Sequence, residues 1–212
     1  MLSLIALAVI LNQRRKKKVL PQQEEKKAVY NEGIKVNLTE EETREAIDWG
    51  IKNKDSPEVF LSSYEFGSQE AYEERGFIVT KFRTLASLGY TSVKTKHKVD
   101  TAHIQPEVKK AIQTVLNTKV LVLDIITYGD EPDFAKDYHI VLKQGEKIIQ
   151  PVGLTAPQRA DTTTRFPQSP SYKAWVEAQF PYSKLDPKGK TTVILIKDQG
   201  DSRFEVDFSH YK

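Results

Sequence analysis

The chain has no cysteine among its 212 residues, and this absence excludes several classes of site. It can form no disulfide, no thiol nucleophile, no iron–sulfur cluster and no zinc site with cysteine ligands. Lipid attachment through a mature N-terminal cysteine is excluded as well. A chain of this length buries roughly 70% of its unfolded surface on folding, so it needs no covalent or metal staple.

Common catalytic and nucleotide-binding motifs are also missing. There is no G-x-S-x-G nucleophile motif, no phosphate-binding loop and no dinucleotide fingerprint, because the ten glycines are scattered. No internal repeat is visible. A mean hydropathy of −0.51 excludes a protein with several membrane spans.

The formal net charge of +3 comes from one short segment. Residues 14–18, RRKKK, carry +5, which leaves −2 for the rest of the chain. Nucleic-acid binding usually needs a basic face on the folded domain. The other basic group consists of Lys94, Lys96, Lys98, Lys109 and Lys110. Since such lysines are usually solvated helix residues, we expect no nucleic-acid partner.

The N-terminal residues 2–11, LSLIALAVIL, are apolar except for Ser3. As a helix they would span about 15 Å, half of a bilayer's hydrocarbon core, which is typical of the apolar region of a signal peptide. The basic residues follow this segment, and the positive-inside rule would hold them in the cytoplasm. Three interpretations stay open. They are an export signal or anchor whose start lies a few codons upstream, a short anchor with a cytoplasmic body, and an apolar terminus that packs on the domain or is disordered.

We divide the chain into an apolar export segment or short anchor at 1–12, a polar basic tether at 13–36 and a single domain at 37–212. The expected membrane contact runs through residues 2–11. The expected location is the cell envelope, either periplasmic or membrane-tethered, with the cytoplasmic side as the alternative.

Helices are predicted in the first half of the domain. A capping box at 39–42 opens a helix that continues to about residue 54, and Pro57 opens a short second helix. The apolar face of the first helix consists of Ala46, Ile47, Gly50 and Ile51. A strand over 76–80 precedes a helix over about 82–97, in which Gly89 either weakens the helix or permits close packing. Pro106 opens a further amphipathic helix.

From residue 119 onward the apolar pattern has a period of two, which is typical of strands. Strands are predicted over 120–128, 138–143, 147–150, 172–180, 191–197 and 203–208, with a helix as the alternative for 172–180. Residues 151–170, with four prolines, form the longest predicted loop. The expected fold class is α+β, an antiparallel, Ig-like β-sandwich of about six to seven strands with two to four helices contributed mainly by the N-terminal half.

The segment 120–128 has no continuous polar face, so we predict a central strand buried on both faces. Asp124 is the anomaly in this strand, because an unpaired buried charge is very costly. We expect its carboxylate to be partly exposed at a sheet margin or bonded to a backbone amide.

Two groups of residues could hold a metal. His97, Asp100 and His103 lie within seven residues and could bind zinc with an open position for water. Their spacing matches no established zinc pattern, and this favours an exposed linker over a metal site. The calcium candidates are Asp130, Glu131, Asp133 and Asp137, but Pro132 and an apolar pair interrupt them, which favours a solvated loop.

Four further residues have structural explanations. His139 falls inside a strand pattern, which favours a structural role over that of a base. His210 lies near the end of the given chain, where we expect mobility. Trp49 and Trp175 could mark a binding patch, although core packing is the default. These observations predict no catalytic, cofactor or metal residue.

Short signatures follow one another along residues 38–209: LTEE at 38–41 with AI at 46–47 and Gly50, YEFG at 64–67, VTKFR at 79–83 with LA at 85–86, QP at 150–151, FP at 180–181 with LDP at 185–187, and VDFS at 206–209. In this order the chain resembles a group of uncharacterised bacterial exported proteins that carry an N-terminal export segment. The resemblance implies an exported location and assigns no catalytic residue.

The function expected from these features is that of a non-catalytic cell-envelope module, exported or tethered, that binds or supports another envelope component. The alternative is a metal-assisted hydrolase that uses His97, Asp100 and His103.

Overall fold

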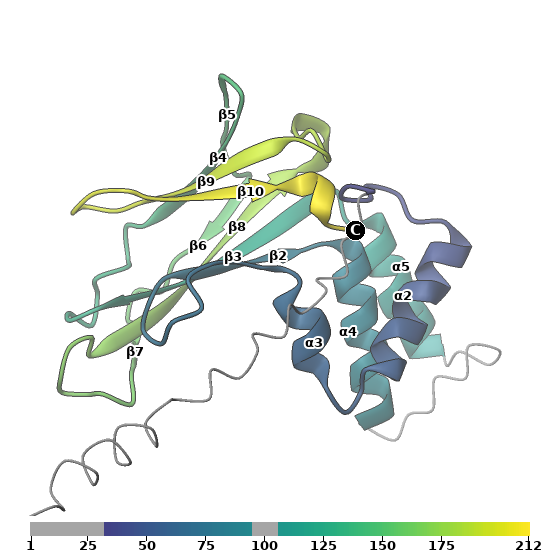
Figure 1. Cartoon of the computed structure of the whole chain (residues 1–212), viewed down its shortest axis with the longest axis horizontal. Coiled ribbons are helices and arrows are strands. Elements are labelled where there is room, and N and C mark those ends of the chain that lie inside the picture. The colour runs from purple at the N-terminus through teal and green to yellow at the C-terminus, as the bar shows by residue number, and fades with distance from the viewer. Residues whose placement is uncertain (1–31, 95–105) are drawn as a thin grey trace, which may run out of the picture.

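The computed structural model describes residues 32–94 and 106–212. Its first half supplies the helices α2 (Glu40–Lys52), α3 (Pro57–Ser62), α4 (Lys81–Lys94) and α5 (Pro106–Asn117). Two short strands, β1 (Glu65–Gly67) and β2 (Arg75–Val79), lie between α3 and α4. The helices stand together at one end of the molecule (Figure 1).

The second half is made of strands. They are β3 (Val120–Gly129), β4 (His139–Gln144), β5 (Lys147–Ile149), β6 (Gly153–Thr155), β7 (Asp161–Thr162), β8 (Tyr172–Pro181), β9 (Lys190–Ile196) and β10 (Ser202–Asp207). The larger sheet has the order β1-β2-β3-β8-β6, with β7 also paired to β8, and the smaller has the order β10-β9-β4-β5. Neighbouring strands pair antiparallel throughout.

The inner faces of the two sheets share one apolar core. Its largest contributions come from alternate residues of β3, β8, β4 and β9, which are Leu121, Leu123, Ile125, Val176, Ala178, Phe180, Ile140, Leu142, Val193 and Leu195. This alternation is the period-two pattern of the sequence, because successive side chains of a strand point to opposite faces. The predicted α+β class, the antiparallel sandwich and the helices of the N-terminal half are confirmed. The Ig-like assignment stays a prediction.

The start and the packing of α2 agree with the sequence. Thr39 Oγ1 accepts from the backbone N–H of Glu42 at 3.1 Å, and Glu42 Oε2 accepts from the backbone N–H of Thr39 at 2.9 Å. This capping box satisfies two amides that the helix itself leaves unpaired. The predicted apolar face then packs on α4 through a second core of Ala46, Ile47, Phe82, Leu85 and Ile112.

The two helices α2 and α4 approach closely at two glycines. A Cβ on Gly50 would lie 1.8 Å from the carbonyl oxygen of Ala86, and a Cβ on Gly89 would lie 2.2 Å from that of Ile47. The second of the two interpretations of Gly89, close packing, is therefore the correct one.

Lys212 joins the helices to the larger sheet, at the point where Figure 1 marks the C-terminal end. Its backbone oxygen accepts from Thr80 Oγ1 at 2.6 Å and from Tyr64 OH at 3.2 Å. Its ammonium donates to Glu45 Oε2 of α2 at 2.8 Å. These contacts fix the helical layer against the end of the sandwich.

The predicted strand over 172–180 is confirmed, because β8 covers this segment, and the helix alternative is rejected. Other sequence expectations were wrong in detail. Residues 151–170 are not loop throughout, since β6 and β7 lie within them, and β1 was not predicted. These strands have only two or three residues, too few to display a period of two.

The expectation for β3 was half correct. The strand is central in the larger sheet, but Val120, Val122 and Asp124 are only half-buried, so the outer face is not buried along its length. The reason is that α4 and α5 do not close over this part of the face, so that these three residues line a hollow between the helices and the sheet.

Candidate functional site

The outer face of the larger sheet brings functional groups together from three strands. The antiparallel register places Asp124 of β3 between Phe77 of β2 and Glu177 of β8. Since paired residues point to the same face, these three side chains form one row. All three are half-buried, so the row is open to a ligand.

Phe77 of this row also stacks on Trp175 of β8, across the intervening strand β3. The rings of Phe77 and Trp175 are stacked, with centroids 5.6 Å apart and planes at 24°. The guanidinium groups of Arg75 and Arg83 lie over Phe77 at 5.9 and 5.8 Å from its centroid. Ile126 of β3, which is the direct cross-strand neighbour of Trp175, is only 5% exposed. Trp175 itself is 48% exposed, so core packing was the wrong expectation for this residue.

Asp124 is neither at a sheet margin nor bonded to a backbone amide. Within the described residues its carboxylate has no hydrogen bond and no ion pair. Burial, and then the neighbouring carboxylate of Glu177, raise the pKa of Asp124 to about 6, while the charge of Arg83 opposes this rise. A carboxylate in this state changes its charge near neutral pH, which is a frequent property of functional sites.

A hollow of about 330 Å³ opens where α4 and α5 meet this face. We call it the helix–sheet hollow. Asp124 and Glu177 line it together with Lys81, Tyr182, two threonines and the apolar residues Val79, Val115, Val120 and Val122.

Lys81 and Tyr182 form a second polar group in the helix–sheet hollow. Lys81 is 3% exposed, and its Nζ donates to the carbonyl of Leu116 in the last turn of α5 at 2.6 Å. Its ammonium lies 5.6 Å from the centroid of the Tyr182 ring. Burial lowers the pKa of Lys81 and raises that of Tyr182. The Tyr182 hydroxyl is buried and finds no hydrogen-bond partner in the described part of the chain.

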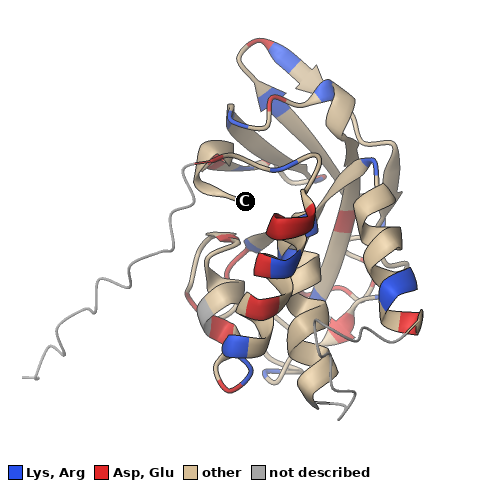
Figure 2. Cartoon of the chain, turned by 90° about the vertical axis from the view of Figure 1, so that its right-hand side faces the viewer, with Lys and Arg blue, Asp and Glu red and all other residues tan. Residues whose placement is uncertain are grey.

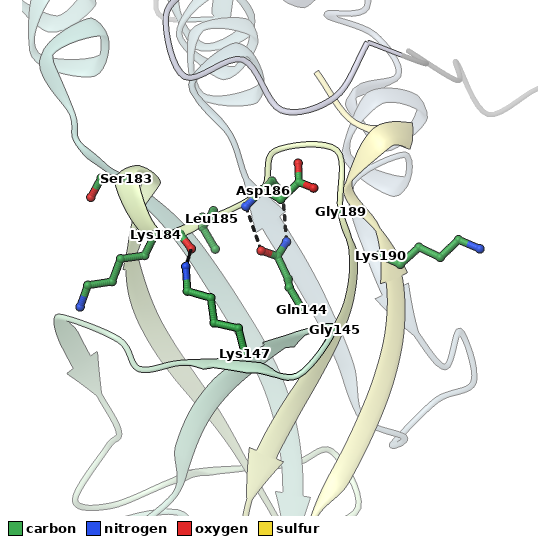
Figure 3. A pocket seen from close by; sticks show the side chains of 9 residues that line it. All are labelled: Gln144, Gly145, Lys147, Ser183, Lys184, Leu185, Asp186, Gly189 and Lys190. Atoms are coloured by element: carbon green, nitrogen blue, oxygen red, sulfur yellow. Dashed lines mark hydrogen bonds between the residues drawn. The ribbon is translucent and has the colours of Figure 1, made fainter.

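A larger hollow, of about 590 Å³, lies between the β4–β5 turn and the segment 183–190. Its polar groups bind one another: Gln144 donates to the Asp186 carbonyl at 2.9 Å and accepts from its amide at 2.9 Å. Lys147 Nζ donates to the Lys184 carbonyl at 2.6 Å, while Lys184 and Lys190 extend away from the hollow (Figure 3). This hollow therefore offers no converging set of free groups.

The sequence-predicted metal residues give no metal site in the described structure. His97, Asp100 and His103 lie outside the described residues. Of the calcium candidates, Asp130 accepts from Ser169 Oγ at 2.9 Å and from the Ser171 amide at 3.0 Å. Residues 32–94 and 106–212 hold no group of three or more metal-ligating side chains.

The remaining candidates also have local roles. His139 is exposed at the start of β4, with Nδ1 2.7 Å from the Asp137 carbonyl. His210 is exposed in a short 3-10 helix and lies 3.9 Å from Asp207. Trp49 packs edge-on against Phe60, with ring centroids 5.2 Å apart.

Glu74 is a half-buried carboxylate with a structural role. Its oxygens accept from Thr127 Oγ1 at 2.6 Å, from Lys197 Nζ at 3.0 Å and from Ser202 Oγ. Burial alone would raise the pKa of Glu74, but these three donors hold it below its ordinary value. Lys197 directly follows β9 and Ser202 begins β10, both in the smaller sheet, whereas Thr127 lies on β3 of the larger sheet, so the group ties the two sheets together.

Figure 2 looks at the helical end and shows acidic and basic residues interspersed over the helices. No helix in the described ranges combines the length and the apolar character that a membrane crossing requires. The apolar segment 2–11 lies outside those ranges.

No family model, curated protein or solved structure matches the chain. The function must therefore be argued from the groups that the fold brings together.

Proposed function

We propose that this protein is an exported, membrane-tethered module of the cell envelope that binds another envelope component and carries out no chemistry. Residues 2–11 supply the membrane attachment, and the polar, basic segment from residue 13 supplies the tether, up to Gly33 and Ile34, which already pack on the domain. The sandwich domain supplies the binding surface. The resemblance to bacterial exported proteins supports the location.

The observation that carries the proposal is the half-exposed Trp175 on an open sheet face. Large aromatic side chains supply contact area at a low entropic cost and are enriched where proteins bind partners. The Trp175 ring is oriented by its stacking on Phe77, and the guanidinium groups of Arg75 and Arg83 pack over the Phe77 ring. A rigid aromatic anchor flanked by charged groups is the pattern of a binding surface.

The location is tested by fractionating cells that express the full chain. We expect the chain in the membrane or envelope fraction, and a variant lacking residues 2–11 in the soluble fraction. The matched control lacks residues 19–28, which removes ten residues of the tether but keeps the apolar and basic segments. Recovery of the full chain in the soluble cytoplasm would overturn the envelope location.

The binding surface is tested in the same cells with a photo-crosslinking aromatic residue at position 175. The control places the same residue at position 148, since Ile148 is equally exposed, at 49%, on the other sheet. We expect a discrete adduct from position 175 and none from position 148. The same products from both positions, or none from 175, would contradict the assignment of this face.

A further inference from the structure

The helix–sheet hollow contains two polar groups of opposite character. On the sheet side, the carboxylates of Asp124 and Glu177 are direct cross-strand neighbours. Like charges in this arrangement are destabilising unless something lies between them. Glu177 accepts from Gln179 Nε2 at 2.9 Å, whereas Asp124 has no hydrogen bond within the described residues. A protonated amine placed between the two carboxylates would satisfy both.

On the helix side, the available groups are donors. Lys81 uses its ammonium to bind the Leu116 carbonyl rather than either carboxylate, which leaves further N–H groups on the same nitrogen. Tyr182 is 6% exposed, and its hydroxyl has no partner in the described part of the chain. The backbone amide of Lys81 lies near that hydroxyl without forming a hydrogen bond. A buried hydroxyl without a partner is unusual and calls for an acceptor.

The surface between the two groups is apolar. Val79, Val115 and Val122 are half-buried and line the helix–sheet hollow from β2, α5 and β3. A ligand that fits has a cationic end, an aliphatic middle and an oxygen acceptor at its other end. The volume of about 330 Å³ lies at the lower end of the range for small-molecule sites.

From this arrangement we infer that the helix–sheet hollow binds a small linear ω-amino acid, with its ammonium between Asp124 and Glu177 and its carboxylate toward Lys81 and Tyr182. The inference goes beyond the proposed function, because it depends neither on the location of the protein nor on Trp175. It makes the domain a receptor for a small zwitterion in addition to its role in the envelope.

Titration calorimetry of the purified full chain tests the inference with δ-aminovalerate as the probe. Pentylamine and pentanoate are its matched single-charge counterparts. We expect δ-aminovalerate to bind about tenfold more tightly than either, because each lacks the partner of one polar group. Equal affinity for all three compounds, or no binding with a dissociation constant below about 10 mM, would overturn the inference.

Variants locate the binding. Asp124→Asn keeps the shape of the side chain and should weaken δ-aminovalerate about tenfold, and Tyr182→Phe should weaken it about threefold. The control is Glu205→Gln, an exposed carboxylate of the smaller sheet, which should leave the affinity unchanged. Thermal unfolding of each variant verifies that it is folded, and Glu177→Gln provides a second variant of the acidic pair. Unchanged affinity in both Asp124→Asn and Glu177→Gln would refute the site.

The pH dependence gives an independent readout. The charged groups around Asp124 are Glu177 on β8 and Arg83 on α4, with Lys81 in the same hollow. The pKa of Asp124 lies at about 6, so its carboxylate takes up a proton as the pH falls through this value and can no longer hold the ammonium. Affinity should fall between about pH 7 and pH 5 in the natural chain and much less in Asp124→Asn. The same pH profile in both would contradict the role of Asp124.

Discussion

Replacing Gly50 by alanine should destabilise the protein, although alanine is the better helix former. In an exposed helix interior this change stabilises by about 1 kcal/mol. At this position, however, the added Cβ would lie 1.8 Å from the carbonyl oxygen of Ala86 on α4. The obstacle is a helix backbone, which cannot move aside as a flexible side chain would.

The size of the effect follows from this overlap. The helices must separate by roughly 1.5 Å before the new methyl reaches ordinary contact distance. This separation loosens the packing of Ile47 and Ala46 against Phe82 and Leu85, all of which are essentially buried. Overpacking of a well-packed core costs about 1–3 kcal/mol and occasionally more, and a clash with backbone belongs at the upper end. After the gain in helix propensity, we expect a net loss of about 2 kcal/mol in the free energy of unfolding.

Urea unfolding followed by circular dichroism measures this loss. Asp48→Ala is the matched control, because it gains helix propensity on the exposed face of α2 and should be neutral or slightly stabilising. Gly89→Ala should also destabilise, since its Cβ would lie 2.2 Å from the Ile47 carbonyl. The double variant should lose less than the sum, because one separation of the helices relieves both overlaps. A Gly50→Ala variant as stable as the natural chain would refute the close packing of α2 on α4.

Three further outcomes are expected. Leu123→Ala, at a fully buried position of the sandwich core, should lower the free energy of unfolding by about 2–5 kcal/mol, and Val122→Ala, on the half-buried face, by about 1 kcal/mol. A loss under about 0.5 kcal/mol for Leu123→Ala in urea unfolding would show that β3 is peripheral. Asp124→Asn should raise the free energy of unfolding at about pH 7 by about 1–2 kcal/mol. Because the pKa of Asp124 is raised on folding, the natural chain loses stability as the pH rises from about 4 to about 6, and the gain in Asp124→Asn should vanish below about pH 4. Elemental analysis of protein purified without chelator tests the hydrolase alternative. That alternative requires one zinc ion per chain and the loss of this zinc in His103→Ala, whereas the envelope module requires no zinc.

The elements that the sequence predicts well are those whose local signals are complete. The helix α2 has a capping box, three acidic residues in its first turn and an apolar stripe, so its start and its packing face could both be named. The strand β8 alternates over ten residues, and the buried positions Ala174, Val176 and Ala178 follow that alternation. Its helix-forming residues lose to tertiary packing, because only a strand places this set in the sandwich core.

The candidate site is less visible in the sequence because its residues meet through strand pairing. Phe77 and Trp175 lie on β2 and β8, which do not pair with each other and are joined only through β3. The local sequence pattern around Trp175 does not predict that β2 will be the second strand from β8 in the sheet. The alternation within β8 does place Trp175 and Glu177 opposite the buried residues, so the outward direction of Trp175 was within reach of sequence reasoning.

Asp124 shows how an exception in the pattern can point to function. Its sequence context marked it as a charge in an apolar strand, and the structure removes both of the expected structural explanations, a sheet margin and a backbone amide. What remains is a carboxylate beside another carboxylate, held where burial disfavours its charge. An asparagine would fit the same space without this electrostatic penalty. Natural proteins accept such local penalties chiefly at functional sites, where the charge itself is needed. The groups that share its hollow, a buried lysine, a tyrosine hydroxyl without a partner and a second acid, are the reason to look for that need in a ligand rather than in the fold.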